Sequence, residues 1–426
     1  MQIRIKGARV IDPGRIDEIT DVLVVDGKIA GLGSEGPSEH DGDPATVIDA
    51  TGKILTPGLI DMHVHFREPG HEYKETIETG CRAAAAGGFT TVCTMPNTLP
   101  VNDNRQITEF ILEKAARSVG SRVLPVGAIS KGIAGQALAD FGDLKASGAI
   151  AVTDDGHPVT NSLLMRNALE YAKGFGLLVI SHCEDLQLSH RGAMNEGELA
   201  TRMGLVGIPN AAESSMVLRD IALCELTKTP LHIAHVSTAQ SVRAIENAKT
   251  RGLPVTAETA PHYFTLTETA VTGYNTNAKM NPPLRSHEDR EAVREALARG
   301  IIDVIATDHA PHTSIEKDVE FDQAVNGIIG LETSLPLGLK LVEDGVLTIE
   351  QLIESMAVKP ALVLGIDNRI RVGNRADLTL IDLNLPFVVD VNRFCSQSRN
   401  SPFDGWQLKG RAVMTMVCGR VVFNEL

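Results

Sequence analysis

Two histidines separated by one residue form the first candidate metal site, within the segment Asp61-Met-His63-Val-His65. Side chains at positions i and i+2 of a β-strand point to the same face, so we expect both imidazoles to project together. Imidazole and carboxylate groups are the ligands that zinc and similar divalent ions take in proteins. This pair alone is a weak indication, because polar residues also end ordinary strands, and further ligands must decide the question.

Four further residues with suitable ligand atoms each follow an apolar run that is typical of a buried strand: Asp155, His182, His235 and Asp308. Six ligands exceed one tetrahedral zinc site and fit two ions that share a bridging carboxylate and a bridging hydroxide. Two neighbouring cations acidify such a water, which then becomes a nucleophile near neutral pH. No lysine stands at the strand end 153–155, so we expect the bridge to be a carboxylate, Asp154 or Asp155.

The elements that must position these residues follow a regular alternation. Eight short apolar runs alternate with longer segments whose periodicity favours helix. The runs are 59–65, 90–95, 122–128, 149–153, 177–182, 231–235, 255–258 and 303–307. The helical segments include 73–86, 107–117, 162–174, 211–226, 239–251 and 288–299. This alternation predicts an α/β fold, a TIM-like (β/α)8 barrel. The alternative is a doubly wound sheet, but no G-x-G-x-x-G motif follows a first strand.

A barrel would also bring the candidate ligands together. The carboxyl ends of all its strands meet at one rim, where catalytic groups lie. The six residues lie in or directly after the first, fourth, fifth, sixth and eighth runs. We therefore expect them to converge at that rim.

The two ends of the chain share a different pattern. Alternating apolar residues open it in Gln2-Ile-Arg-Ile-Lys6, and Asp26-Gly27 is typical of a hairpin turn. Similar strand patterns return after about residue 370, whereas 34–44 is polar and turn-rich, as in a loop. We predict that 1–57 and 371–426 form one small β-sandwich domain and that 58–370 form the barrel.

Composition limits the classes of function. The 426 residues are 43% hydrophobic and 22% charged, which suits a barrel domain with a smaller companion. A net charge of −14 argues against nucleic acid as a partner, although a metal centre would still attract a small anionic substrate. The sequence has no apparent signal peptide or membrane span, and its six cysteines are scattered, so we expect a cytoplasmic protein without a membrane partner.

These motifs resemble those of the dihydroorotase family of the amidohydrolase superfamily, in particular its bacterial class I type with an aspartate bridge. The matching segments are 61–70, 95–98, 153–156, 181–184, 232–237, 258–262, 279–285 and 307–312, and they follow the family's order. The resemblance implies a zinc-dependent cyclic amidohydrolase that interconverts L-dihydroorotate and N-carbamoyl-L-aspartate in de novo pyrimidine (UMP) biosynthesis. It also implies a homodimer and allows a complex with aspartate carbamoyltransferase.

The resemblance implies a role for each ligand. His63, His65 and Asp308 would hold one zinc ion, and His182 and His235 would hold the other. Asp155, rather than Asp154, would bridge the two ions. Asp308 would also act as the general base and general acid.

The resemblance further implies the substrate contacts. Arg67, Asn97 and His312 would bind the α-carboxylate, beside His65, and the planar fork of an arginine suits a carboxylate better than a lysine does. Asn281 and the backbone of Asn326 and Gly327 would contact the ring amide groups. Several relatives have phenylalanine where this chain has Asn326.

Two other functions fit part of the pattern. The metal ligands also suit another cyclic amidohydrolase, such as an allantoinase or a dihydropyrimidinase, but a neutral ring does not need the carboxylate clamp of Arg67 and Asn97. A non-catalytic, dihydroorotase-like scaffold for aspartate carbamoyltransferase is the second alternative. Such scaffolds lack several ligands, whereas this chain retains all six.

Overall fold

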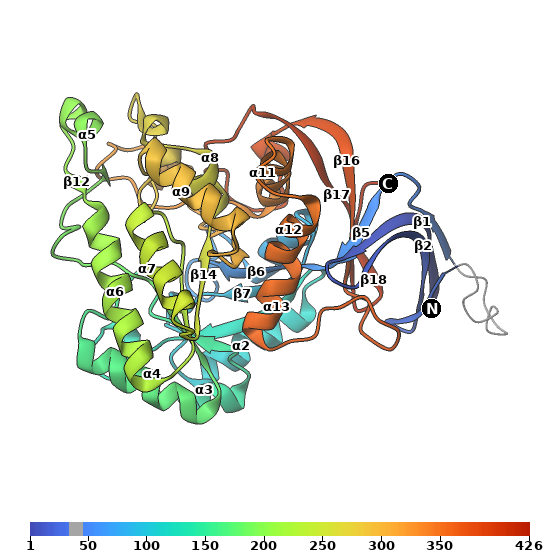
Figure 1. The fold of residues 1–426 in the computed structure, drawn as a ribbon, viewed down its shortest axis with the longest axis horizontal. Helices are drawn as coiled ribbons and strands as arrows, with labels where there is room; N and C mark the ends of the chain where they lie inside the picture. Colours follow the sequence, from blue (N-terminus) through green and yellow to red (C-terminus); the bar gives the residue numbers. More distant parts are fainter. Residues whose placement is uncertain (34–45) are drawn as a thin grey trace.

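Eight short parallel strands form the barrel in the computed structural model, which describes residues 1–33 and 46–426 (Figure 1). In chain order they are β6 (Leu59–Val64), β7 (Phe89–Thr94), β8 (Arg122–Gly127), β9 (Ala151–Val152), β10 (Leu178–Ser181), β13 (Leu231–Ile233), β14 (Val255–Thr259) and β15 (Val304–Ile305). Each strand pairs with the next, and a bridge between Val64 and His309 brings the two ends of the sheet together. Each predicted run overlaps one of these strands, so the barrel is confirmed. The loop expected at 34–44 lies outside the described residues.

Helices follow the strands and cover the outside of the barrel (Figure 1). The longer ones are α1 (Ile77–Ala86), α2 (Arg105–Arg117), α3 (Phe141–Ser147), α4 (Ser162–Phe175), α6 (Asn210–Thr227), α7 (Ala239–Thr250), α9 (His287–Ala298) and α11 (Leu331–Glu343). Local signals set their ends: the Thr76 side chain accepts from Thr79 N before α1, and Gly176 ends α4 with a φ of 61°. Shorter helices are α5 (Glu198–Met203), α8 (Pro261–Thr265), α10 (Ser314–Lys317), α12 (Ile349–Ile353) and α13 (Lys359–Leu364). Among the helices of the described residues, none is both long and apolar enough to cross a membrane.

Two apolar layers hold the barrel together. One layer consists of buried strand residues that pack against one another: Ile60, Met62, Cys93, Val126, Ala151, Ile180 and Val304. The other lies between the strands and the surrounding helices, where Phe89 and Val92 are fully buried. Burying each such large apolar side chain contributes roughly 1.5–3 kcal/mol to the stability of the fold.

The two ends of the chain join in a second, mixed sheet, and both termini lie on its side of the molecule (Figure 1). Its strands are β1 (Gln2–Asp12), β2 (Ile16–Val25), β3 (Lys28–Leu32), β4 (Thr46–Asp49), β5 (Ile54–Pro57), β16 (Leu378–Val388), β17 (Gln407–Val417) and β18 (Arg420–Asn424). Strand β5 pairs antiparallel with β16, which links the amino-terminal strands to the carboxyl-terminal ones. This sheet has its own buried cluster, which includes Ile5, Val24 and Met414. The segment 389–406 between β16 and β17 reaches back to the barrel mouth.

Candidate functional site

The structure brings the six predicted ligands together at the carboxyl ends of the barrel strands. His63 lies in β6 and His65 directly follows it, and the other four follow β9, β10, β13 and β15. Two sets of three have ligand atoms within 4.8 Å of one another: His63, His65 and Asp155, and Asp155, His182 and His235. Asp155 belongs to both sets, which is the position expected of a bridge.

Both carboxylate oxygens of Asp155 face imidazole nitrogens. Its Oδ1 lies 3.3 Å from His63 Nε2 and 3.5 Å from both His182 Nδ1 and His235 Nε2. Its Oδ2 lies 3.4 Å from His65 Nε2. Asp308 joins the same cluster, with Oδ1 3.2 Å from His65 Nε2 and 3.6 Å from His63 Nε2.

The neighbouring Asp154 has a different role. Its Oδ1 accepts a hydrogen bond of 2.9 Å from the backbone N–H of Ser130, and its Oδ2 accepts from the Ser130 hydroxyl. The carboxylate therefore ties the end of β9 to the segment after β8. This geometry distinguishes the two aspartates, which strand-end spacing alone does not.

The donor set fits a divalent metal. Within the described residues, His63 Nε2 and Asp155 Oδ1 are buried and have no hydrogen-bond partner. Buried polar atoms without partners are rare, because the lost solvation is not replaced. His63 Nδ1 lies 2.7 Å from Glu258 Oε1, which can only accept, so the proton is on Nδ1 and the lone pair of Nε2 faces the cluster. A cation among these atoms would satisfy them.

Other ligands are oriented in the same way. His65 Nδ1 donates to Asn97 Oδ1 at 2.8 Å, and His182 Nε2 donates to Glu184 Oε2 at 3.0 Å. The opposite nitrogen of His65 faces Asp155, and that of His182 lies 2.8 Å from His235 Nε2 and 3.5 Å from Asp155 Oδ1. Partners of this kind fix the tautomer and the direction of a metal-binding histidine.

Glu184 and Glu258, the carboxylates that contact the ligand histidines His182 and His63, are held in their ionised form. Burial alone would raise the pKa of Glu184, but the hydrogen bond from His182 lowers it to about 2. Burial acts likewise on Glu258, whose pKa is held well below its ordinary value by His63 and His232. Both groups therefore remain acceptors for the histidines across the neutral pH range.

Three residues of the site have left-handed backbone conformations. Arg67, His235 and Asp308 have φ values of 64°, 34° and 50°. Such angles cost a residue other than glycine of order 1–3 kcal/mol and are found where surrounding contacts enforce them. Asp61 supplies one such contact, because its Oδ1 accepts from Thr307 N at 3.0 Å, next to Asp308.

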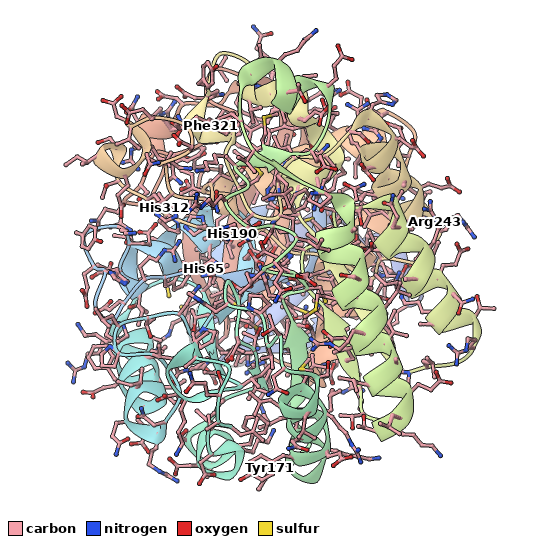
Figure 2. All side chains as sticks on the ribbon, turned by 90° about the vertical axis from the view of Figure 1, so that its left-hand side faces the viewer. His65, Tyr171, His190, Arg243, His312 and Phe321 are labelled. Atoms are coloured by element: carbon pink, nitrogen blue, oxygen red, sulfur yellow. The ribbon has the colours of Figure 1, made fainter. Side chains whose placement is uncertain are left out.

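A cavity of about 510 Å³ opens beside the ligands. Its wall includes every predicted substrate contact: His65, Arg67, Asn97, Asn281, His312, Asn326 and Gly327. Asp155, His182, His235 and Asp308 also line it, whereas His63 lies deeper and is fully buried. Figure 2 looks at the molecule from the side opposite the terminal sheet, and His65 and His312 both lie near the middle of that view.

Arg67 and His312 lie side by side in this wall. His312 Nε2 is 2.8 Å from the carbonyl oxygen of Asn326, so it carries the proton and donates. Arg67 Nη2 lies 3.3 Å from the same nitrogen. Two donors cannot satisfy each other, so a shared acceptor such as a carboxylate would suit both, provided that His312 Nε2–H exchanges its present bond to Asn326 O.

Asn281 and Gly327, two other predicted contacts, also have hydrogen-bond partners. Asn281 Nδ2 donates to Glu184 Oε2 at 2.9 Å, so Glu184 links it to His182. Gly327 N donates to Lys279 O at 3.0 Å. Substrate contact through the Asn326–Gly327 backbone therefore requires an exchange of hydrogen bonds.

The sequence motifs did not reveal several supporting residues. Glu184 and Glu258 lie in segments that match the family, but the motifs assign them no role. The spacing His182-x-Glu184 is the one sequence feature that indicates a carboxylate beside a ligand. Asn400 gave no signal, because it lies in the segment between β16 and β17. Its Nδ2 donates to Ala310 O at 3.0 Å and Gly327 O at 3.1 Å, and its Oδ1 accepts from His312 N at 3.1 Å.

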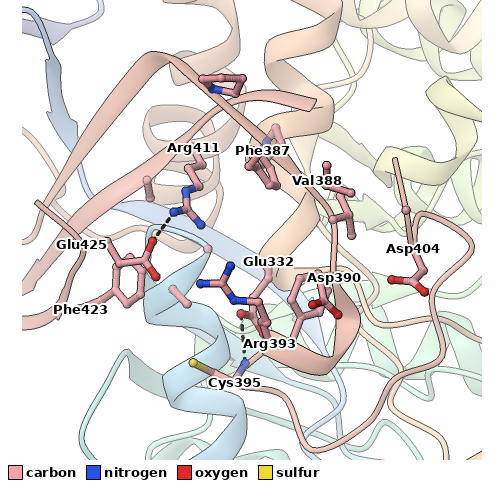
Figure 3. Close-up of a pocket in the computed structure, with 18 residues that line it drawn as sticks. Glu332, Phe387, Val388, Asp390, Arg393, Cys395, Asp404, Arg411, Phe423 and Glu425 are labelled. Atoms are coloured by element: carbon pink, nitrogen blue, oxygen red, sulfur yellow. Dashed lines mark hydrogen bonds and ion pairs between the residues drawn. The ribbon is translucent and has the colours of Figure 1, made fainter. Parts of the chain in front are cut away.

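A second cavity, of about 700 Å³, lies beside α11, β16 and β17 (Figure 3). Arg411 pairs with Glu425 there, and Glu332 Oε2 accepts from Cys395 N at 3.1 Å. Burial raises the pKa of Glu332 to about 7. None of the six metal-ligand candidates lines this cavity, so it is separate from the candidate site.

Comparison with known proteins agrees with this geometry. A family model described as Dihydro-orotase-like matches residues 52–241. Proteins named Dihydroorotase from Desulforapulum autotrophicum and Geobacter sulfurreducens are 58% and 60% identical to this chain, and the matches cover 100% of each protein.

Solved structures of related enzymes share the fold. An L-hydantoinase (dihydropyrimidinase) from Arthrobacter aurescens has a TM-score of 0.88 at 28% identity, over 99% of this chain and 96% of that one. A D-hydantoinase (dihydropyrimidinase) from Thermus sp. has a TM-score of 0.83 at 27% identity, over 99% and 95%. The dihydroorotases are about twice as similar in sequence over the same length. The chain therefore belongs to the dihydroorotase family of cyclic amidohydrolases.

Proposed function

We propose that this chain is a dihydroorotase that hydrolyses the ring of L-dihydroorotate to N-carbamoyl-L-aspartate and catalyses the reverse cyclisation in pyrimidine biosynthesis. One observation carries the proposal. A single cavity has the His and Asp cluster in its wall together with Arg67 and His312, whose Nη2 and Nε2 atoms lie 3.3 Å apart. This combination suits a cyclic amide that bears a carboxylate.

The metal is proposed to be zinc, with two ions that share Asp155. Three residues stand in each ligand set, and their imidazole and carboxylate atoms are the donors that zinc takes. When bound, a divalent ion supplies Lewis acidity to a carbonyl and lowers the pKa of water.

The chain's own residues account for the remaining steps. Hydrolysis joins the oxygen of water to the ring carbonyl carbon, breaks the ring C–N bond and adds a proton to the nitrogen. Asp308 lies at the cavity wall within the cluster, where it can accept a proton from water and deliver it to that nitrogen. Cyclisation uses the same group in reverse.

Substrate orientation is assigned to Arg67, His312 and Asn97, which line the same cavity. Arg67 and His312 donate to the carboxylate. Asn97 offers Nδ2, because its Oδ1 accepts from His65. The ring is thereby held with its amide toward the cluster, and Asn281 lies in the wall near Glu184.

Turnover of three cyclic amides tests the proposal. We expect the metal-loaded protein to hydrolyse dihydroorotate in preference to allantoin and dihydrouracil. Arg67→Gln should raise KM for dihydroorotate by roughly 100-fold, because the desolvated, charge-assisted pair between Arg67 and the substrate carboxylate is lost. The same variant should not slow any residual reaction with neutral dihydrouracil. Comparable wild-type turnover of allantoin or dihydrouracil would contradict the assigned substrate.

The same preparation tests the scaffold alternative, which predicts a protein without metal and without activity. A homodimer, a cytoplasmic location and a complex with aspartate carbamoyltransferase are expectations that rest on the family resemblance. Size-exclusion chromatography with and without the transcarbamoylase tests both assemblies.

A further inference from the structure

Lys74 lies behind the substrate cavity, where its ammonium group contacts two residues. Its Nζ is 2.6 Å from Glu316 Oε1 and 3.3 Å from His312 Nδ1. The residue is only 8% exposed and does not line the cavity itself. Lys74 therefore acts on a substrate only through His312.

The contacts on the two sides of the imidazole are complementary. An ammonium group can only donate, so His312 Nδ1 accepts from Lys74 and carries no proton. The carbonyl oxygen of Asn326 can only accept, so Nε2 carries the proton. Nε2 is also the nitrogen that lies beside Arg67.

Glu316 gives the lysine a second role. Glu316 Oε2 lies 3.8 Å from His312 Nδ1, close enough to attract a proton to that nitrogen. Lys74 neutralises this carboxylate and occupies the lone pair of Nδ1. Burial, together with the charges of Arg67, Lys74 and Lys317, holds the pKa of His312 well below its ordinary value.

We propose that Lys74 is a positioning residue that fixes the neutral Nε2–H tautomer of His312, so that this ring donates to the substrate carboxylate beside Arg67 in place of the carbonyl oxygen of Asn326. The inference rests on the proposed function, because it concerns the carboxylate of dihydroorotate. The alternative is that Lys74 only anchors α10 through Glu316, in which case the His312 tautomer would not depend on it.

Nitrogen-15 spectra of histidine-labelled, metal-loaded protein test the tautomer directly. The signals of His312 are identified by their absence in His312→Gln. We expect a protonated Nε2 and a bare Nδ1 in the wild type. In Lys74→Met the freed Glu316 should draw a proton to Nδ1, and KM for dihydroorotate should rise about tenfold with a smaller change in kcat.

Two further variants separate positioning from a structural effect. Lys74→Met combined with Glu316→Gln should restore the Nε2–H tautomer and recover part of the lost KM. Lys317→Met removes a buried lysine at the end of α10 that does not contact His312. It should leave the tautomer unchanged. Lys74→Leu replaces Lys74→Met if the latter does not fold, because leucine neither neutralises Glu316 nor donates to His312 Nδ1.

The outcomes are distinguishable from failure of the proposed function. A protonated Nδ1 in the wild type, an unchanged tautomer in Lys74→Met, or an altered tautomer with unchanged KM each overturns the role of Lys74. Absence of dihydroorotate turnover by the metal-loaded wild type instead overturns the proposed function, whatever the spectra show.

Discussion

The carboxylate of Glu258 holds the imidazole of His63, with Oε1 2.7 Å from Nδ1. Both side chains are almost completely buried. Glu258 lies on β14, whereas His63 lies on β6, so a second barrel strand controls the direction of the first ligand. The Nε2 of His63 consequently faces Asp155 rather than the barrel wall.

Replacing Glu258 with glutamine should weaken metal binding by about 10–100-fold. Glu258 accepts from His63 through Oε1 and contacts His232 Nε2 through Oε2 at 3.2 Å, and an amide cannot accept at both positions. Residual metal after dialysis against increasing chelator concentrations measures the effect. Glu75→Gln is the matched control, because Glu75 is buried beside His309, which is not a predicted ligand. Equal metal retention in wild type and Glu258→Gln would refute the role of Glu258.

Asp308→Asn should keep the fold and the metal but lower kcat by roughly 10²–10⁴-fold, the usual contribution of a general acid or base. An amide oxygen can still face the cluster, but the amide does not shuttle a proton at neutral pH. Steady-state turnover is measured together with metal content and circular dichroism, because loss of the ion would also abolish activity. A fully loaded variant with wild-type kcat would exclude Asp308 as the proton carrier.

The barrel and the ligand cluster were predictable because they follow from local patterns. Apolar runs of strand length recur with helical segments between them, and ligand-type residues stand where the runs end. A barrel then places these ends on one rim, whatever the details of packing. The predicted positions of His182 and His235, separated by more than 50 residues, depended on this geometry alone.

The supporting contacts were not predictable, because they join segments that no local pattern relates. Asn400 belongs to the carboxyl-terminal segment and yet contacts the loop after β15. The hydrogen bond between His65 and Asn97 depends on how closely two adjacent strand ends approach. The separate roles of Asp154 and Asp155 depend on backbone direction after a two-residue strand, which spacing leaves open.

Asn400→Asp should lower the free energy of unfolding by about 1–3 kcal/mol, because a carboxylate would face two carbonyl oxygens in place of donating to them. KM for dihydroorotate should rise as well, since Asn400 also holds the backbone of His312. Urea denaturation and steady-state kinetics measure the two effects. Asn384→Asp, at an exposed position of β16, should change neither quantity. An unaltered KM in a destabilised Asn400→Asp would limit this residue to a structural role.

Lys317 should make stability depend on pH. Its Nζ donates to the carbonyl oxygens of Val325, Thr276 and Lys279 at 2.8, 3.0 and 3.2 Å, and among the described residues no carboxylate pairs with it. Burial, followed by the charge of Lys279, lowers its pKa from 10.5 to about 7. Above that value the unfolded chain binds more protons than the folded one, so the free energy of unfolding rises with pH.

The difference in unfolding free energy between wild type and Lys317→Met isolates this effect, because other titrating groups cancel. The variant loses the three hydrogen bonds that the ammonium group of Lys317 makes, which sets the difference below about pH 7. From about pH 7 to pH 9 the unfolding free energy of the wild type should rise relative to that of the variant by at most about 1.4 kcal/mol per pH unit. Below about pH 7 the difference between the two should not change with pH. Urea denaturation across this range measures it. A difference that stays constant or shrinks as pH rises would show that Lys317 remains fully protonated in the folded protein.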